Sequence, residues 1–210
     1  MKKDDLITLH SKYSNGKYKN EWVDIVWTHS QIVLLIALKI VKNLEKKEIN
    51  VDKTLLEEGI LLHDIGVYSC YDEELNPDHS APQYIQHGLL GYEILKNEGF
   101  DESISRFAKS HTGTGLTKED IVKGSLPLPK EDMIPITLEE EILCYADKFH
   151  TKYPAFSSFE EQKLQLAKYS ERNEYMMENF CKKFGIPDTT DIQKKYNPWN
   201  QKIDKFLSNI

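Results

Sequence analysis

The sequence predicts an all-α fold, a helical bundle with additional helices towards the C-terminus. Apolar residues recur at intervals of three and four positions over long stretches, which is typical of helices that bury one face. Capping signals mark where several of these stretches begin, and glycines mark where they end. No stretch of the sequence keeps up the alternation of apolar and polar residues that half-buried strands would need.

The first predicted helix covers residues 21–48, because its apolar residues fall on one helical face. A second is expected to begin after Asp52, whose side chain can cap a helix, and to stop at Gly66. Residues 67–80 are expected to form a loop, since they contain an Asn-Pro step.

A third helix is predicted from about Pro82 to Asn97, and a fourth, capped by Asp101, is expected to end near His111. Residues 116–136 contain three prolines and a glycine. Proline and glycine interrupt helices, so this segment is predicted to be a long structured loop or a lid.

Two capping boxes open the predicted helices that follow. Thr137 with Glu140 opens the fifth helix, and Ser158 with Glu161 opens a sixth that continues to about Phe184. In such a box the hydroxyl and the carboxylate each accept a hydrogen bond from the other residue's backbone N–H. A last helix is expected to end the chain.

Composition limits the class of protein. The 210 residues are 40% apolar and 29% charged, which fits one domain with a real core and a charged surface. The net charge of −7 argues against nonspecific binding of nucleic acid, which needs a positive surface. An odd number of cysteines, three, gives no disulfide framework. With no signal segment after the charged N-terminus and no predicted membrane span, a cytoplasmic location is expected.

Six residues of metal-binding type stand out from the rest of the chain. They are His29, His63, Asp64, His87, His111 and Asp147. Their spacings of 34, 1, 23, 24 and 36 residues are too long for a compact loop motif and suit one ligand, or one adjacent pair, from each of five successive helices. Four imidazoles and two carboxylates exceed what one metal with open positions needs. They are about right for two metals that share a carboxylate.

The neighbours of these residues are apolar. His29 shares a predicted helix face with Val26 and Val33, and Asp147 follows Leu143 by one turn. An unpaired carboxylate that faces a core is costly, so Asp147 needs a cation or hydrogen-bond donors. Taken singly, each histidine is more often an ordinary core residue, and each aspartate can be a cap or the partner of a lysine. The joint pattern on five helices favours a metal centre.

The other histidines give weaker signals. His10 lies in a polar N-terminal segment and His150 just beyond the turn of Asp147, so both are predicted to be surface residues. His79 lies in the loop before His87 and is a weak candidate for contact with a substrate. Lys148 is a second weak candidate, with a solvated surface position as the alternative.

The motifs resemble those of the HD superfamily of metal-dependent phosphohydrolases. Residues 61–66 carry the His-Asp pair in the order Leu-Leu-His-Asp-Ile-Gly, a helical histidine precedes it, and residues 146–148 read Ala-Asp-Lys. The resemblance implies an HD domain at 21–150, between an N-terminal segment at 1–20 and a C-terminal helical extension at 151–210 packed on the same domain.

The resemblance also implies a role for each of the six residues. Asp64 would bridge two metals and act in catalysis, one metal would also be held by His29, His63 and Asp147, and the other by His87 and His111. The pattern is similar to that of bacterial symmetrical diadenosine tetraphosphate hydrolases, and more similar to small HDIG-type proteins. Two divalent ions per chain are expected, with iron or manganese favoured and magnesium, cobalt, nickel or zinc compatible.

Two subgroups of the superfamily fit less well. Cyclic-di-GMP phosphodiesterases usually have a lysine soon after the His-Asp pair and a Gly-Tyr-Pro motif. Here Val67 and Tyr68 follow Gly66, and no Gly-Tyr-Pro occurs. Members similar to inositol oxygenase also tend to have a lysine in that region.

The favoured interpretation is an HD-type hydrolase of phosphoester or phosphoanhydride bonds that uses a metal-bridging hydroxide. Its substrate would be a nucleotide or another small phosphorylated metabolite, and the sequence allows a homodimer. An alternative is an HD-type mixed-valence di-iron oxygenase, which uses the same ligand set. A second alternative is a non-catalytic metal-dependent sensor, against which the complete set of ligands argues.

Overall fold

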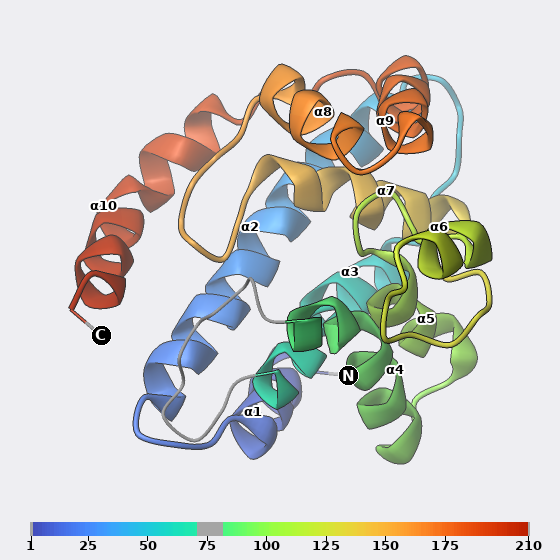
Figure 1. Ribbon diagram of the computed structural model, residues 1–210. Helices are drawn as coiled ribbons and strands as arrows, with labels where there is room; N and C mark the ends of the chain where they lie inside the picture. Colours follow the sequence, from blue (N-terminus) through green and yellow to red (C-terminus); the bar gives the residue numbers. More distant parts are fainter. Residues whose placement is uncertain (1, 71–81, 210) are drawn as a thin grey trace.

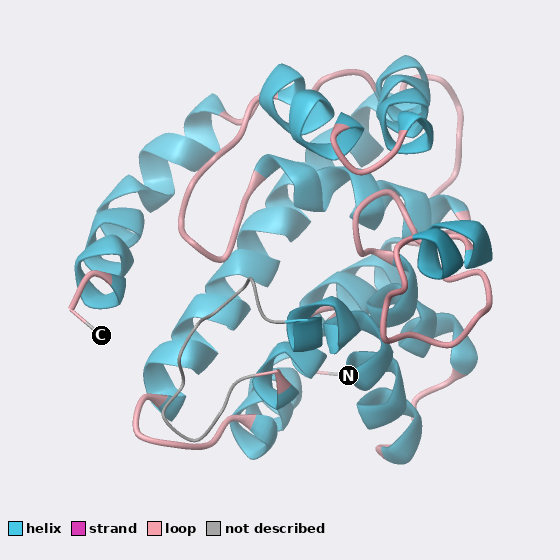
Figure 2. Cartoon of the chain, in the orientation of Figure 1, coloured by secondary structure: helices cyan, strands magenta, loops and turns pink. Residues whose placement is uncertain are grey.

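A computed structural model describes residues 2–70 and 82–209, and these residues form helices joined by loops, without a strand (Figure 2). The all-α prediction is therefore confirmed. The elements are α1 (Lys3–Tyr13), α2 (Lys19–Glu45), α3 (Lys53–Leu62), η1 (Ile65–Ser69), η2 (Pro82–Gln86), α4 (His87–Asn97), α5 (Glu102–Ser110), α6 (Lys118–Lys123), α7 (Leu138–Ala146), η3 (Asp147–Phe149), α8 (Phe159–Ala167), α9 (Glu171–Phe184) and α10 (Thr190–Leu207), where η marks a 3-10 helix.

The long helix α2 lies at the centre of the fold, in contact with α1, α3, α7, α9 and α10 (Figure 1). Its residues Ile25, Val33, Ile36 and Ile40 are fully buried. By length and hydropathy alone α2 could cross a membrane, but 67% of its most apolar window is buried inside the structure. Packing against the other helices therefore already covers most of its apolar surface.

The second predicted helix starts where expected and ends earlier. The Asp52 side chain accepts a hydrogen bond from the N–H of Leu55, as a capping residue does. The helix ends at Leu62, and the 3-10 helix η1 then takes up part of the predicted loop; residues 71–80 of that loop lie outside the described residues. Gly66 is not the stop. It lies within η1, where a Cβ atom would come 2.0 Å from the carbonyl oxygen of His87.

Two predicted segments contain a helix boundary that the sequence analysis did not place. Within residues 116–136 the short helix α6 forms, because Thr117 and Asp120 make a capping box. The predicted sixth helix is two helices, α8 and α9. The Ser158 capping box opens the first as expected, and the Ser170 side chain caps the second by accepting from the N–H of Asn173.

The start of α7 is tied to α5 by a buried ion pair. Thr137 accepts a hydrogen bond from the N–H of Glu140, which is half of the predicted capping box. The Glu140 carboxylate is buried and pairs with Arg106 at 2.8 Å, and it also accepts from the N–H of Ile136. The ion pair fixes α7, whose C-cap is Asp147, against α5, whose C-cap is His111.

His10 is fully buried, so the prediction of a surface position was wrong. The N-terminal segment forms helix α1, and the ring of His10 turns inward from it. Nε2 lies 2.8 Å from the carbonyl oxygen of Leu61, and Nδ1 lies 3.0 Å from the hydroxyl of Tyr68. Because a carbonyl can only accept, Nε2 carries the proton and Nδ1 accepts from Tyr68. A neutral imidazole thus satisfies both contacts.

This arrangement predicts acid sensitivity. Burial lowers the pKa of His10 from 6.5 to about 4. Between these values the unfolded chain binds a proton that the folded protein excludes, so stability is lost as the pH falls. At pH 5 the loss should be about 2 kcal/mol relative to pH 7. The side chain of glutamine cannot titrate in this range. Between pH 7 and pH 5, the free energy of unfolding of the metal-free wild type should therefore fall by about 2 kcal/mol more than that of His10→Gln. Urea unfolding at the two pH values measures both. Equal losses in the two proteins would contradict the assignment.

Candidate metal centre

All six residues that the sequence singled out lie at one place, most of them at or next to the end of a helix. His29 lies in the middle of α2, and His87 is the first residue of α4. His63, His111 and Asp147 occupy the C-cap positions of α3, α5 and α7. Three helix C-termini, each with a partial negative charge, therefore converge on the cluster and favour a cation there.

Asp64 stands at the centre of the cluster, with one carboxylate oxygen turned to each side. Oδ2 lies 3.4 Å from Nε2 of His29 and 3.3 Å from Nε2 of His63. Oδ1 lies 3.6 Å from Nε2 of His87 and 3.4 Å from Nε2 of His111. The side chain is fully buried. This is the arrangement expected of a carboxylate shared by two cation sites.

Asp147 completes the first side. Its Oδ1 lies 3.0 Å from Nε2 of His29 and 3.6 Å from Nε2 of His63, and its side chain is 12% exposed. The donor atoms of His29, His63 and Asp64 lie within 4.8 Å of one another, and so do those of Asp64, His87 and His111. The structure therefore contains two adjoining groups of possible ligands that share Asp64.

Backbone carbonyls set the direction of three imidazole rings. Nδ1 of His63 lies 2.7 Å from the carbonyl oxygen of Ile60, Nδ1 of His87 lies 2.8 Å from that of Tyr84, and Nδ1 of His111 lies 2.7 Å from that of Ala108. Each Nδ1 therefore carries a proton that it donates. In the neutral ring Nε2 is left with its lone pair, pointed at the cluster, as in histidines that bind metals.

The unsatisfied atoms of the cluster fit divalent cations. The Nε2 atoms of His87 and His111 face each other at 2.9 Å, although both rings already donate through Nδ1. Two lone pairs at this distance repel each other unless a cation or a proton lies between them. Nε2 of His63 and Oδ1 of Asp64 are buried without a hydrogen-bond partner. Buried groups of this kind require an explanation, and nitrogen and carboxylate donors together suit transition metals.

The protonation states agree with this assignment. Burial lowers the pKa of His29, of His111 and, to about 3, of His87, so these rings are neutral at pH 7. Burial would also lower the pKa of His63, but the carboxylate of Asp64 raises it to about 9. His63 therefore holds a proton that a cation at Nε2 would displace.

Two lysines reach the same carboxylates. Lys148, for which a solvated surface position was the alternative, is buried, with Nζ 2.8 Å from Oδ2 of Asp147 and 3.3 Å from the carbonyl oxygen of His111. Lys152, which the sequence analysis missed, places Nζ 2.5 Å from Oδ2 of Asp64. Burial alone would raise the pKa of both carboxyl groups. Instead, Lys148 holds the pKa of Asp147 well below its ordinary value. His63 and Lys152 do the same for the pKa of Asp64.

His150 is also buried, so its predicted surface position was wrong. Its Nδ1 lies 2.9 Å from Nδ1 of His29, and burial holds the pKa of His150 well below its ordinary value. A neutral His150 can accept a hydrogen bond from the Nδ1–H of His29. Nε2 of His29 then keeps its lone pair and faces Asp64 and Asp147. The remaining weak candidate, His79, lies outside the described residues.

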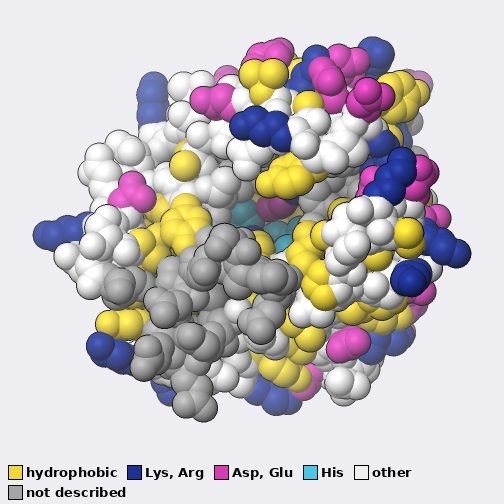
Figure 3. All heavy atoms as spheres, in the orientation of Figure 1, with side chains coloured by type: hydrophobic (Ala, Val, Ile, Leu, Met, Phe, Trp, Pro, Cys, Tyr) yellow, Lys and Arg dark blue, Asp and Glu magenta, His cyan; other side chains and the backbone are white. Residues whose placement is uncertain are grey.

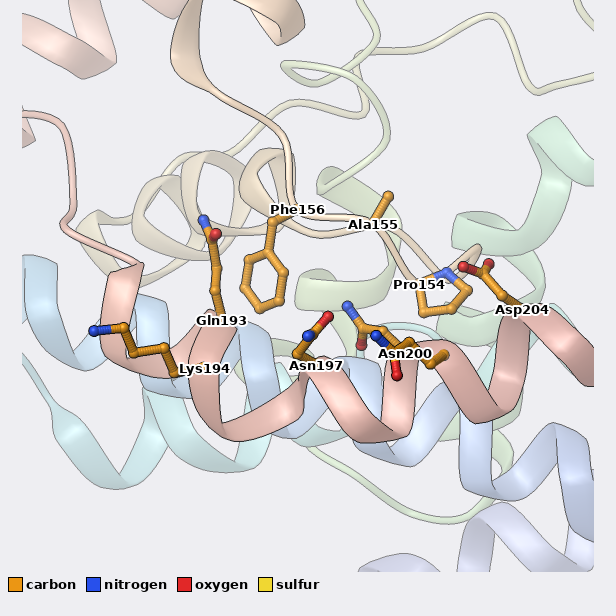
Figure 4. A pocket seen from close by; sticks show the side chains of 9 residues that line it. Pro154, Ala155, Phe156, Gln193, Lys194, Asn197, Asn200 and Asp204 are labelled. Carbon is orange, nitrogen blue, oxygen red and sulfur yellow. The ribbon is translucent and has the colours of Figure 1, made fainter.

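Histidine and acidic side chains are visible on the floor of a hollow on one face of the molecule (Figure 3). A separate groove of about 460 Å³ runs between α10 and the loop at 154–156 (Figure 4). Its walls include Phe156, Gln193 and Asn197, and none of the six cluster residues lines it. We therefore assign chemistry to the buried cluster and not to this groove.

Comparison with known proteins identifies the family. The family model described as HD domain matches residues 26–152, which is more than half of the chain. The chain belongs to the HD-domain family. The matched residues include all six members of the cluster.

Several proteins are similar to this HD-domain chain. An uncharacterised protein of Methanocaldococcus jannaschii is 38% identical over 136 residues, which are 64% of this chain and 72% of that protein. tRNA (cytidine(56)-2'-O)-methyltransferases of Picrophilus torridus and Thermoplasma volcanium are 34% and 30% identical, over 59% and 92% of this chain. The aligned regions are only 31% and 45% of those two proteins, so this chain spans less than half of their length.

Solved structures with likeness to this chain include the HD domain of the L. monocytogenes phosphodiesterase PgpH. It is 18% identical, with a TM-score of 0.49 over 83% of this chain and 94% of that domain. The same domain in complex with cyclic-di-AMP has a TM-score of 0.48 at 18% identity, over 84% of this chain and 92% of that domain.

Proposed function

We propose that this HD-domain chain hydrolyses phosphoester or phosphoanhydride bonds in a nucleotide or another small phosphorylated metabolite, with two divalent cations per chain, of which iron or manganese are favoured. The observation that carries the proposal is the position of Asp64, with one oxygen toward each group of histidines. Cations bound there would polarise the phosphoryl group and lower the pKa of a bound water.

The chain's own residues supply the rest of such a site. Asp64 and Asp147 provide the negative charge that holds cations, and the carbonyls behind the histidines keep their Nε2 atoms turned inward. Lys148 keeps Asp147 in position through its second oxygen. Asp64 is fully buried whereas the side chain of Asp147 is 12% exposed, so a substrate is expected to enter on the side of Asp147.

Charge also favours a phosphorylated substrate. The protein as a whole carries a net charge of −7, which would repel phosphates at long range. Two divalent cations with Lys148 and Lys152 would add six positive charges beside only two carboxylates, so the field in the hollow would be locally positive. In a metal site the local charge decides which ligands bind.

The test is a hydrolysis screen with protein that has been reconstituted with manganese or with iron. The substrates should include nucleoside mono-, di- and triphosphates, dinucleoside polyphosphates, cyclic dinucleotides and simple phosphate monoesters. We expect release of phosphate or of a nucleotide from at least one class. Oxygen uptake together with a mixed-valence iron signal in electron paramagnetic resonance, without hydrolysis, would instead support the di-iron oxygenase. Filled sites with neither activity would favour a sensor.

A separate prediction concerns the second group of ligands, Asp64, His87 and His111. His87→Ala and His111→Ala should each lower the metal content from two ions to about one per chain, because His29, His63, Asp64 and Asp147 remain for the first site. Elemental analysis measures the content, and circular dichroism should show the helices intact. His63→Ala should abolish hydrolysis. A His87→Ala protein with two ions and the full rate would contradict the assignment of His87.

A further inference from the structure

Lys152 lies against Asp64, the central carboxylate of the cluster, where it can also reach a bound substrate. Nζ of Lys152 lies 2.5 Å from Oδ2 of Asp64, and the lysine side chain is 11% exposed whereas the aspartate is fully buried. Removing an ammonium from water is costly unless a close partner compensates it. Here the compensating partner is the central carboxylate of the metal centre, which comes from a part of the chain 88 residues away.

The ammonium and a cation would compete for the same oxygen. Oδ2 of Asp64 faces the Nε2 atoms of His29 and His63 at 3.4 and 3.3 Å, so a cation held by these two histidines would bind this oxygen too. An ammonium at 2.5 Å from that oxygen would then lie within a few ångströms of a divalent charge. Repulsion between like charges in a buried site is strong, so the ammonium has to move when the cation binds.

The backbone of this segment is fixed, so any displacement of the ammonium has to come from rotation of the side chain. The segment around Lys152 is held by backbone hydrogen bonds from Thr151 to Ala155 and from Ser157 to Phe149. Nζ of Lys152 also lies 5.8 Å from the ring centre of Tyr84, beside His87. A lysine has a long, flexible stem, so a small rotation can carry the ammonium from Asp64 toward the open side of the site.

Lys148 differs in a way that excludes it from the same role. Its Nζ contacts Oδ2 of Asp147 at 2.8 Å and the carbonyl oxygen of His111 at 3.3 Å. Asp147 turns its other oxygen, Oδ1, toward the histidines, so a cation can bind there without meeting this ammonium. Lys148 therefore remains a positioning residue after cations bind.

We propose that Lys152 is the phosphate-binding residue of this site: its ammonium neutralises Asp64 while the first cation position is empty, and turns to a phosphoryl oxygen of the substrate once cations are bound. The proposal rests on the proposed phosphohydrolase function. No covalent step is involved, since the lysine only exchanges one negatively charged oxygen partner for another. The exchange links cation binding to the appearance of a phosphate-binding group.

The experiment measures two affinities by calorimetry. The first is that of Mn²⁺ for the metal-free protein, and the second is that of inorganic phosphate for the Mn²⁺-loaded protein. Lys152→Met should bind Mn²⁺ several-fold more tightly, because no ammonium has to be displaced. It should bind phosphate more weakly by roughly tenfold or more, which is typical for loss of one hydrogen bond between charged groups. Lys152→Arg should retain phosphate binding.

The matched control is Lys163→Met, which removes a partly buried lysine that pairs with Glu178 between α8 and α9. It should leave both affinities at their wild-type values. If Lys152→Met unfolds, as judged by circular dichroism, Lys152→Gln and Lys152→Arg carry the comparison. Phosphate affinity unchanged by the loss of the lysine, while the wild type binds phosphate, overturns the role of Lys152 and leaves the hydrolase standing. Failure of the Mn²⁺-loaded wild type to bind phosphate overturns the role of Lys152, whereas the hydrolase itself is overturned only if the substrate screen shows no hydrolysis.

Discussion

Replacing Asp64 with asparagine should abolish hydrolysis and remove both metal ions. One oxygen of Asp64 faces each group of histidines, so loss of the negative charge weakens both cation sites at once. Mutation of residues that only orient metal ligands costs about 10- to 100-fold in affinity or activity. A shared ligand should cost more, so we expect a fall in rate of more than about 100-fold. Elemental analysis and the rate of hydrolysis measure the two effects.

A surface aspartate provides the control for this variant. Asp191→Asn makes the same chemical change at an exposed residue of α10, where the carboxylate pairs with Lys39. It should keep two ions and the wild-type rate. An Asp64→Asn protein that kept two tightly bound ions would show that Asp64 does not join the two sites.

Removal of metal should lower the melting temperature by several degrees. Without cations, the buried Asp64 and Asp147 rely on protonated His63 and two lysines for compensation. A metal that binds only the folded chain, at a hundredfold excess over its dissociation constant, stabilises by about 2.7 kcal/mol. For a chain of this size each kcal/mol corresponds to roughly 2 to 4 °C. Chelation should therefore cost roughly 5 to 11 °C in thermal scans.

The comparison needs a control that is not a histidine. His10 and His150 are both buried and hold other elements in place, so their replacement would itself change stability. Asp191→Asn should show the full effect of chelation, whereas Asp64→Asn should show little. Equal melting temperatures of wild type before and after verified removal of metal would mean that these residues form no metal site in the folded state.

The sequence was sufficient to predict the all-α fold and to select six residues that the structure brings together. The reason is that these residues interrupt apolar helical faces, and a charged or basic group on such a face has to be compensated inside the fold. His29 shows this directly, since its neighbours Val26 and Val33 are fully buried. The regular spacing of a helix makes the direction of such a side chain predictable.

Lys152 and His150 could not be found in the same way. They follow the short 3-10 helix η3 in an irregular segment, where no periodicity links position in the sequence to direction in space. His10 is a similar case, because its polar neighbours on α1 concealed the side that faces Leu61 and Tyr68. The break between α8 and α9 was missed because Ser170 can either cap a helix or lie within one.

Because the chain is synthesised from its N-terminus, the two groups of ligands are completed at different times. His87 and His111, with Asp64, are complete as soon as residue 111 has been added, but the first half waits for Asp147, which is 118 residues beyond His29. At about 5 to 20 residues per second the interval between His111 and Asp147 lasts roughly 2 to 7 s. During this interval five of the six ligands exist and only Asp147 is missing, and Lys152, the competitor of a cation at Asp64, has not yet been synthesised.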